Sequence, residues 1–344
     1  MTQNDNLQPG RSFALELVRV TEAAAISAAR FMGRGEASNG GKAAAEAMLT
    51  FLSTVNMKGL IVMEDGKQDE HGLFQKAALI GNGQGPEVDI ALAPADGAPS
   101  SGQEKQNCIA AISLAERGSM WNPGHASYLN KIVVEQQARE AIDIRLSPTE
   151  NLHRIAEALG KKVRELSVFV LDKARHGSLI EETQQAGARL TLHNDGDILG
   201  ALLAAMPGTG IDVLMGVGGA TEGLIAAAAV KALGGGMQAV RAPQWEDEKR
   251  RLKEDGVKTR EVLTLDTLIR SDNVFFAATG ITPGTLLDGI HFSSTGSVTA
   301  SSITLRSLTG SMRFIKGTYR LTQQPPGSGP AGATPAQVAF EVVE

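Results

Sequence analysis

Acidic side chains that could bind a metal ion follow several apolar segments of this chain. Asp96 lies in the turn LAPADGAPSS at the end of the apolar run PEVDIALA, and acidic clusters occupy residues 64–70 (EDGKQDE) and 195–197 (DGD). Hard cations such as Mg²⁺ prefer several oxygen ligands, and carboxylates that converge from different strand ends would supply them. A solvated acidic turn is the alternative for each cluster.

A glycine-rich stretch, IDVLMGVGGATEGL, could bring backbone close to a ligand. An apolar strand leads into Gly216, Gly218 and Gly219, and a helix is expected to begin near Thr221 with Glu222 in its first turn. Glycines permit close approach of the backbone, and the free N–H groups of a helix start favour an anion. A tight strand-to-helix turn, in which Glu222 stabilises the helix dipole, is equally consistent with the spacing.

Two further stretches could contact an anion. FFAATGITPGTLLDG repeats the strand-to-glycine arrangement at Thr279, Gly280 and Thr282. The basic stretch KARH (173–176) follows an expected strand and places Arg175 where its guanidinium can grip a phosphate bidentately. A basic tetrapeptide by itself does not define a site.

The elements that must position these residues alternate between helix and strand. Apolar residues recur at helical spacing over residues 13–31, and a second helix (43–52) and a strand (59–63) follow. The alternation becomes regular in the second half of the chain, which indicates an α/β layered sheet. The expected elements there are helices at 150–159, 176–186 and 196–205 and strands at 167–172, 189–192 and 211–215.

The composition excludes several classes of protein. The chain of 344 residues has a net charge of −5, and its lysines and arginines form no dense cluster of the kind that tracks a nucleic-acid backbone. No apolar run reaches membrane-spanning length and the first residues are polar, so a cytoplasmic protein without nucleic-acid or membrane partners is expected. The single cysteine, Cys108, lies in an apolar segment and is expected to be buried and inert.

The last part of the chain differs in composition from the rest. Residues 322–335 (TQQPPGSGPAGATP) form a linker too poor in apolar side chains to fold, and the alternating peptide AQVAFEVVE (336–344) follows. Such a peptide can add a strand to a sheet edge of a partner. A frayed tail is the simpler interpretation.

Taken together, these stretches resemble a known family, the class II fructose-1,6-bisphosphatases, a bacterial type whose cyanobacterial members also act on sedoheptulose 1,7-bisphosphate. The resemblance covers about residues 13–321 and includes LELVRVTEAAAISAARFMGRG, ENLHRIAEALGKKVREL and DVLMGVGGATEGLIAAAAVKALGGGMQ. It implies a layered α/β/α sandwich, usually oligomeric, that uses Mg²⁺ or Mn²⁺ to hydrolyse the 1-phosphate of a sugar bisphosphate. The expected divisions are a phosphatase-like subdomain (11–146), a sugar-phosphate subdomain (147–321) and the linker with its peptide (322–344).

The family's metal site rests on four places, and this sequence departs from the family pattern at three of them. Gly41 stands at the second aspartate of the pattern GRGDxxxADxxA, and the acidic loop IGEGExDE reads MEDGKQDE, with Asp65 and Lys67 in place of two glutamates. Lys67 puts a positive charge where the resemblance implies a cation.

The third place is the turn DPxEGT of the family, which reads APADGA in this chain. Ala93 replaces the leading aspartate, Asp96 is a shortened acid, and Ala98 replaces a threonine that helps to activate the attacking water in the family. The glutamate of the fourth place is kept as Glu222. The resemblance therefore implies a weakened metal site, with Asp65, Asp96 and Glu222 as the remaining ligands and Asp96 and Asp65 as the catalytic candidates of an active enzyme.

The sugar-phosphate part of the family site is mostly present. In the family the matching positions contact the sugar hydroxyls and the distal phosphate, and in this chain they are Tyr128, Arg175, His176, Asp195, Asp197, Gly218 and Gly219.

Three hypotheses follow from this combination. The leading one is a catalytically impaired homologue, a pseudoenzyme, that binds a sugar bisphosphate or co-assembles with an active paralogue or with itself. The second is an active sugar bisphosphatase with Mg²⁺ or Mn²⁺ in a rearranged site, built from Asp65, Asp69, Glu70, Asp96 and Glu222. The third is a docking protein that acts through its C-terminal peptide. If the protein is inactive, no cofactor is expected.

Overall fold

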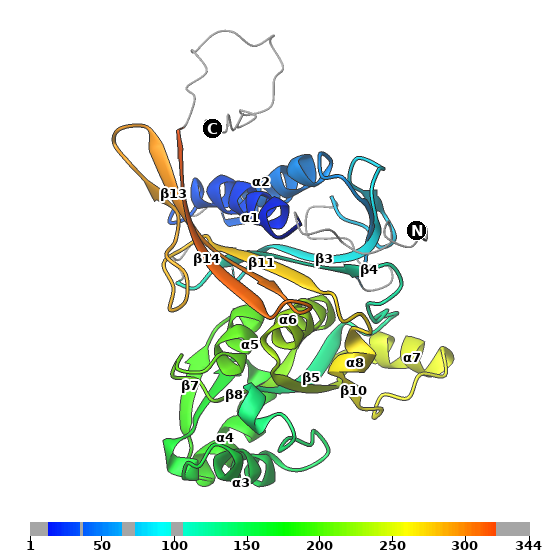
Figure 1. The fold of residues 1–344 in the computed structure, drawn as a ribbon. Helices are drawn as coiled ribbons and strands as arrows, with labels where there is room; N and C mark the ends of the chain where they lie inside the picture. Colours follow the sequence, from blue (N-terminus) through cyan, green and yellow to red (C-terminus); the bar gives the residue numbers. More distant parts are fainter. Residues whose placement is uncertain (1–12, 35–36, 64–72, 98–105, 321–344) are drawn as a thin grey trace.

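The computed structural model describes residues 13–34, 37–63, 73–97 and 106–320. It contains two mixed β-sheets with helices between them and on their outer faces (Figure 1). The α/β sandwich expected from the sequence is therefore confirmed. None of the helices in the described ranges is long and apolar enough to cross a membrane.

The first sheet has eight strands in the order β12-β13-β11-β4-β3-β1-β2, with β14 paired to β13. Only β1 and β3 run parallel among the described pairs, and the other pairs are antiparallel. The strands are β1 (Lys58–Ile61), β2 (Leu79–Ile80), β3 (Glu87–Asp96), β4 (Ile109–Glu116), β11 (Phe275–Gly280), β12 (His291–Phe292), β13 (Ser297–Arg306) and β14 (Ser311–Arg320).

The second sheet has six strands in the order β10-β9-β5-β8-β6-β7. The strand β6 runs parallel to both β7 and β8, and the remaining pairs are antiparallel. The strands are β5 (Tyr128–Val134), β6 (Ser167–Leu171), β7 (Arg189–His193), β8 (Val213–Gly219), β9 (Gly236–Arg241) and β10 (Leu263–Thr264).

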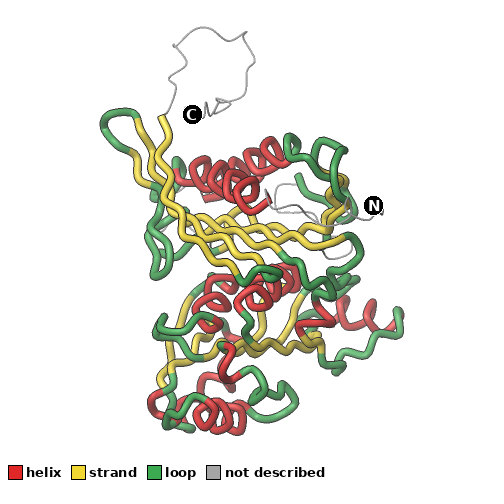
Figure 2. The backbone as a smooth tube through the Cα atoms, viewed as in Figure 1, coloured by secondary structure: helices red, strands yellow, loops and turns green. Residues whose placement is uncertain are grey.

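The helices form layers around these sheets. Helices α1 (Phe13–Ala29) and α2 (Ala37–Leu52) cover one face of the first sheet, and α5 (Asp197–Ala205) and α6 (Ala220–Leu233) fill the space between the sheets (Figures 1 and 2). The outer face of the second sheet packs against α3 (Pro148–Ala158) and α4 (Gly177–Gln185). The remaining helices are α7 (Glu246–Glu254), α8 (Leu265–Leu268) and the 3₁₀ turns Gln136–Ala138, Val163–Glu165 and Ala174–His176.

Local sequence explains where several helices begin. Ser147 caps α3 by accepting from the Glu150 N–H, the Glu150 carboxylate accepts from the Ser147 N–H, and Pro148 occupies the first turn. This capping box satisfies two donors that the helix would otherwise leave unpaired. The second helix differs from its expected range, because it begins at Ala37 rather than near Ala43.

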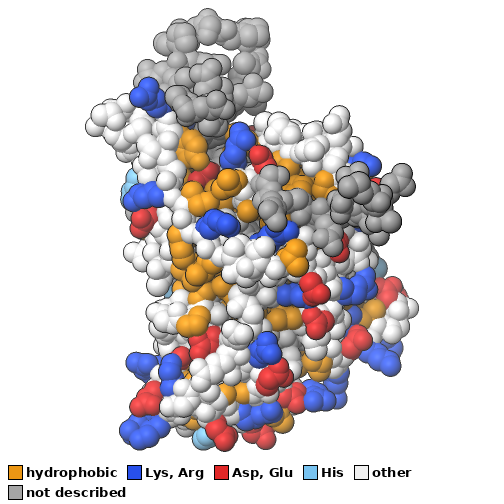
Figure 3. All heavy atoms as spheres, viewed as in Figure 1, with side chains coloured by type: hydrophobic (Ala, Val, Ile, Leu, Met, Phe, Trp, Pro, Cys, Tyr) orange, Lys and Arg blue, Asp and Glu red, His pale blue; other side chains and the backbone are white. Residues whose placement is uncertain are grey.

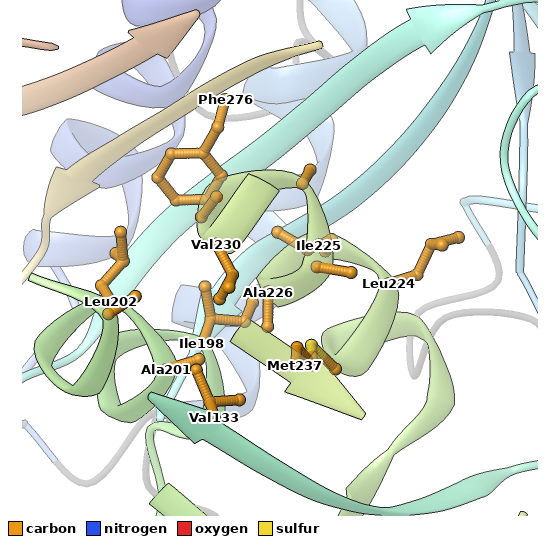
Figure 4. Packing of buried hydrophobic residues seen from close by; sticks show 14 of the residues in the cluster. Val133, Ile198, Ala201, Leu202, Leu224, Ile225, Ala226, Val230, Met237 and Phe276 are labelled. Atoms are coloured by element: carbon orange, nitrogen blue, oxygen red, sulfur yellow. The ribbon is translucent and has the colours of Figure 1, made fainter. Parts of the chain in front are cut away.

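The central helices are buried on nearly every side because a sheet lies on each side of them. Figure 4 shows Ile198 and Leu202 of α5 and Val230 of α6 between Phe276 of the first sheet and Val133 of the second. All five side chains belong to one hydrophobic cluster. An amphipathic pattern is therefore weak in these helices, since no face remains for solvent.

Each of the two sheets contains strands from before and from after residue 147, the expected boundary between the subdomains. The first sheet takes β1 to β4 from before residue 147 and β11 to β14 from after it, and the second sheet takes β5 from before that point. Sheet membership does not test which segments fold independently. The expected division into 11–146 and 147–321 stays a prediction, and residues 322–344 lie outside the described residues.

Candidate functional site

Asp96 ends β3 at the point where the first sheet meets the start of α5. The register between β3 and β4 shifts between Ala93 and Asp96, which turns the end of the strand away from regular pairing. One oxygen of the Asp96 carboxyl accepts from the Ile198 N–H at 3.3 Å, in the first turn of α5. The next residue, Gly97, has φ 76°, and a Cβ built on it would lie 3.6 Å from the Gly196 nitrogen. The turn ADG of β3 thus lies against the turn DGD before α5.

Acidic side chains from three elements gather around Asp96. Burial, and then the negative charges of Glu222, Asp197 and Asp195, raises the pKa of Asp96 to about 8. The Asp96 carboxyl therefore carries a proton through most of the pH range below that value. The structure brings these four carboxyl groups near one another from the end of β3 and from the segments that follow β7 and β8, whereas the acidic cluster at 64–70 lies outside the described residues.

Glu222 lies in the first turn of α6 and folds back over the preceding glycine. A Cβ built on Gly219 would lie 1.9 Å from a Glu222 carboxylate oxygen, so no larger residue fits there without displacing Glu222. The strand β8 continues through Gly219, which pairs with Tyr128 of β5. The strand therefore extends past its expected end at 215 to include the glycines. The helix begins immediately after it at Ala220, next to the expected Thr221, with Glu222 in its first turn as expected.

A buried ion pair lies beside the next glycine of β8. The Lys131 side chain of β5 is fully buried, and its Nζ lies 2.5 Å from the Asp197 Oδ2. A Cβ on Gly218 would lie 2.1 Å from that oxygen and 2.5 Å from the Lys131 nitrogen. Glycine at 218 thus leaves space for this ion pair. In the low-dielectric interior the attraction between the two charges offsets the cost of burying them. The charge of the Asp197 carboxylate is therefore balanced by Lys131 of the same chain.

Basic side chains line the neighbouring loop after β6. Lys173 donates to the Asp195 carboxylate at 2.8 Å. The exposed Arg175 donates to the Val217 carbonyl through Nε (3.1 Å) and a terminal nitrogen (3.0 Å), and its guanidinium lies over the Tyr128 ring at 5.4 Å. The carbonyl and the ring hold the guanidinium in one orientation, which prepares it to bind an anion.

His176 is buried and both of its ring nitrogens contact the backbone. Its Nδ1 lies 2.6 Å from the Leu171 carbonyl, and its Nε2 accepts from the Val217 N–H at 2.8 Å. These partners require a neutral ring with the proton on Nδ1, and burial lowers the pKa of His176 in the same direction. Gly216, with φ 130°, leaves room for the ring, because a Cβ there would lie 2.9 Å from Nε2. His176 therefore joins the loop after β6 to β8, and its contact with a substrate stays a prediction.

Some of the positions at which this sequence departs from the family pattern lie in the described part of the chain, and the others lie outside it. Gly41 lies within α2, and Ala93 is half-buried near the end of β3, where it packs against the central hydrophobic cluster. Asp65, Lys67, Asp69, Glu70 and Ala98 lie outside the described residues.

The carboxylates of the described residues do not make up a metal site by themselves. Over the described ranges, no group of three or more His, Cys, Asp or Glu side chains is arranged to hold a metal ion. Asp96 and Glu222 lie close enough to interact electrostatically, but Asp195 and Asp197 are each paired with a lysine. Hard cations need more oxygen ligands than one pair of carboxylates supplies. The described residues therefore do not fit a divalent cation by themselves.

The threonine hydroxyls of the stretch FFAATGITPG bond other parts of the fold. The Thr279 hydroxyl is buried 2.8 Å from the hydroxyls of both Thr21 and Ser302, and the Thr282 hydroxyl accepts from the Cys108 N–H at 3.0 Å. No helix follows β11 within the described residues 281–296. The strand leads into Gly280 as expected, but no helix start follows it there, and these hydroxyls bond neighbouring strands and α1.

The sequence motifs did not predict that Lys131 and Lys173 pair with acidic side chains of the candidate site. Lys131 interrupts the apolar alternation of YLNKIVV at a position buried between two sheet neighbours, and a lysine at such a position needs an anionic partner. A surface hollow of about 570 Å³ lies elsewhere, along α3 and the turn after it, and none of the expected site residues lines it.

Comparison with known proteins identifies the family. Residues 11–319 match the family described as bacterial fructose-1,6-bisphosphatase, glpX-encoded. The chain is 36% identical over 330 residues to fructose-1,6-bisphosphatase 1 class 2 of Escherichia coli (strain K12), a match that covers 92% of this chain and 97% of that protein. The class 2 fructose-1,6-bisphosphatase of Shigella flexneri matches to the same extent. The collinear match over nearly the whole length, together with the acidic and basic groups gathered at the ends of β3, β6 and β8, shows that this chain belongs to the class II fructose-1,6-bisphosphatase family.

Proposed function

We propose that this chain is a class II fructose-1,6-bisphosphatase homologue with little or no phosphatase activity, which retains a sugar-bisphosphate-binding scaffold. The observation that carries the proposal is the contrast between the two halves of the site. The resemblance implies carboxylates where this chain has Gly41 and Ala93, whereas Arg175 and Tyr128, which match the sugar-phosphate half, are present and contact each other.

The chemistry of phosphoryl transfer explains why the first half matters. Metal ions neutralise the transferred group, orient the attacking water and stabilise the leaving oxygen. Ala93 brings a methyl group to the position of a carboxylate, and Ala98 has no hydroxyl with which to orient water. Each lost group costs on the order of a hundredfold in rate, and groups that act as a unit together leave no measurable turnover.

Support for binding comes from the loop after β6. Arg175 is exposed, and its guanidinium is already oriented by a carbonyl and an aromatic ring. Lys173 adds a second cation a short distance along the loop, next to Asp195, whose carboxylate can accept from a sugar hydroxyl. Because the guanidinium is held before a ligand arrives, less conformational entropy is lost on binding.

The test measures catalysis and binding on the same preparations. Wild-type protein and the triple variant Gly41→Asp, Ala93→Asp, Ala98→Thr are assayed for phosphate release from fructose 1,6-bisphosphate and sedoheptulose 1,7-bisphosphate with Mg²⁺ and with Mn²⁺. We expect no turnover above background for the wild type and at least a hundredfold gain in the triple variant. Adding Glu222→Gln to the triple variant serves as the control and should remove the gain.

Binding is measured on the wild type by calorimetry without divalent metal. Arg175→Ala should weaken binding of the bisphosphate by about ten- to a hundredfold, as expected for a charge-assisted bond to phosphate. Arg164→Ala, an exposed arginine beside the distant hollow, is the matched control and should bind as the wild type does.

A wild-type rate near the roughly 1–100 per second typical of kinases, which also transfer phosphoryl groups, would overturn the impaired-enzyme proposal. Equal binding by both arginine variants would overturn the proposed ligand site.

An active enzyme with a rearranged metal site is the second candidate, and one observation favours it. Burial, and then the like charges of its neighbours, raise the pKa of Asp96, and a bound cation would relieve the repulsion between those charges. Asp65, Asp69 and Glu70 would complete the ligand set with Asp96 and Glu222. Wild-type turnover that Asp96→Asn and Glu222→Gln both abolish would establish this candidate in place of the first.

Assembly is the remaining part of the proposal. A scaffold without activity can still act by forming a homo-oligomer, or a hetero-oligomer with an active paralogue. Static light scattering on the purified chain, alone and mixed with an active class II enzyme, tests this part. An unchanged monomer mass in both samples would contradict it.

A further inference from the structure

The strand β14 forms a long free edge of the first sheet. It pairs with β13 along all ten of its residues, from Ser311 opposite Arg306 to Arg320 opposite Ser297. In the described part of the chain no strand pairs with its other side. Figure 1 shows β14 at the front edge of the sheet, and Figure 2 shows that its end extends beyond α1 together with β13. An edge of this length exposes a row of backbone donors and acceptors that proteins usually cover.

Apolar side chains on this edge extend the hydrophobic interior outward. Phe314 and Met312 are 53% and 47% exposed, and they pair with Ile303 and Leu305 of β13, which are buried in the central cluster. In the space-filling view, hydrophobic side chains with lysines and arginines beside them run down the side of the molecule that holds β13 and β14 (Figure 3). Residues Met312 and Phe314 lie on the side of the strand opposite Ile315, which packs towards α1 and α2.

The charge of the edge is positive. Arg313, Lys316 and Arg320 are exposed, and β14 contains no acidic residue. Lys316 lies 3.6 Å from Asp288, and Arg313 donates to the Ser311 hydroxyl. Pairing of two copies of β14 would place these cations opposite one another, which opposes a dimer built on this edge.

A segment with the complementary character follows in the same chain. Residues 336–344, AQVAFEVVE, place Val338, Phe340 and Val342 at alternate positions and carry Glu341 and Glu344 but no basic residue. We propose that residues 336–344 dock as an antiparallel strand on the free edge of β14 in the same chain. This inference goes beyond the proposed function and does not depend on it.

One register gives matching partners to Phe340, Val342 and Glu341, while Val338 falls opposite Lys316 in it. With Phe340 opposite Phe314, Val342 falls opposite Met312 and Glu341 falls opposite Arg313. Side chains alternate between the two faces of a strand, so this register puts the apolar pairs on one face and the ion pair on the other. Directly opposite residues have Cβ atoms about 5 Å apart, close enough for both kinds of contact.

The connection between the two strands has sufficient length. In this register residue 334 lies opposite Arg320, so residues 321–333 make the return connection, rich in proline and glycine. A connection of that length spans far more than the roughly 5 Å between adjacent strands. A short flexible tether gives an effective concentration in the millimolar range, which favours docking within one chain over docking between chains.

Hydrogen exchange of the β14 amides tests the docking on the full chain. Phe340→Asp removes the apolar anchor, and Gln337→Asp adds the same charge in the same peptide without removing an apolar side chain. We expect β14 amides to exchange at least about tenfold faster in Phe340→Asp than in Gln337→Asp, whereas amides of β4 exchange equally in both. Equal exchange of β14 in the two variants would overturn the proposal.

Charge exchange tests the register. Arg313→Glu and Glu341→Arg should each speed exchange of β14 by about two- to fivefold, the size of a cross-strand ion pair, and the double variant should return to the wild-type rate. A double variant as fast as the single ones would overturn the register. Protection of β14 that falls on dilution would show that the peptide comes from a second copy, and it would overturn docking within one chain.

Discussion

At the scale of single residues, four carboxyl groups gather where the first sheet meets α5 and α6. Asp96 lies among Glu222, Asp195 and Asp197, and burial with these charges raises its pKa to about 8. Lys131 pairs with Asp197, and Lys173 pairs with Asp195, so Glu222 is the neighbour of Asp96 whose charge no lysine of these two pairs balances. Buried carboxyl groups held this close together lower the free energy of unfolding.

The pH dependence of stability follows from the raised pKa of Asp96. Between the pKa of 3.8 in an unfolded chain and about 8 in the native state, the native protein holds a proton that the unfolded chain has released. Stability therefore falls as the pH rises through this window. Asp96→Asn removes the effect, and we expect it to raise the free energy of unfolding by about 2 kcal/mol near pH 8, with no gain near pH 4.

Urea unfolding at several pH values measures this difference. Asp172→Asn, at an exposed position just after β6, is the control and should leave the free energy of unfolding within about 0.5 kcal/mol of the wild type. A gain from Asp96→Asn that is the same at both pH values would contradict the argument.

At the scale of elements, a buried polar network joins α1 to the edge of the first sheet. Glu22 of α1 is 3% exposed, and its carboxylate accepts from the hydroxyls of Tyr319 on β14 and Ser302 on β13. Burial raises the pKa of Glu22, while these donors act in the opposite direction. Gly317 contributes by lacking a side chain, because a Cβ there would lie 2.9 Å from the Tyr319 ring. The network holds β14 in place at the end of the sheet.

Removing one donor should weaken that attachment. We expect Tyr319→Phe to lower the free energy of unfolding by about 1–3 kcal/mol at neutral pH, because it leaves the buried Glu22 carboxylate with one hydrogen bond fewer. Tyr128→Phe removes a hydroxyl from a half-buried ring and should change the free energy of unfolding by less than about 0.5 kcal/mol. Equal losses in the two variants, measured by urea unfolding, would show that the bond to Glu22 contributes nothing specific.

At the scale of the whole molecule, one hydrophobic cluster joins the two sheets. It contains residues of β3, β4 and β11 from the first sheet, of β5, β8 and β9 from the second, and of α5 and α6 between them. Unfolding of either sheet would expose the buried faces of both central helices. The two halves should therefore unfold together.

Two optical probes test this cooperativity. Trp121 packs against the central cluster, so its fluorescence reports on the interface between the sheets, and far-UV circular dichroism reports on all the elements. We expect coincident urea transitions by both probes. Separate transitions would instead support the division of the chain into two folding units near residue 147.

Much of the fold could be predicted because it depends on local patterns. The helices over 150–159 and 176–186 and the strands over 167–172 and 189–192 lie within one or two residues of α3, α4, β6 and β7. The capping box at Ser147 and the alternation of apolar residues are short-range signals, and they act before any distant contact forms. The class of fold followed from such signals taken in order along the chain, whereas the family was recognised from the resemblance of whole segments.

Less of the candidate site than of the fold could be predicted from the sequence. Residue identities alone determined that positions 41 and 93 carry no carboxylate and that positions 96 and 222 do. Only the tertiary structure decided that Lys131 lies against Asp197, that both nitrogens of His176 are bonded to backbone, and that the glycines of β8 lie within a strand. The contact between Lys131 and Asp197 joins residues 66 positions apart, and the bond from Val217 to His176 joins residues 41 positions apart, so no local pattern encodes them. The space that one side chain leaves for another exists only after the strands and helices have packed.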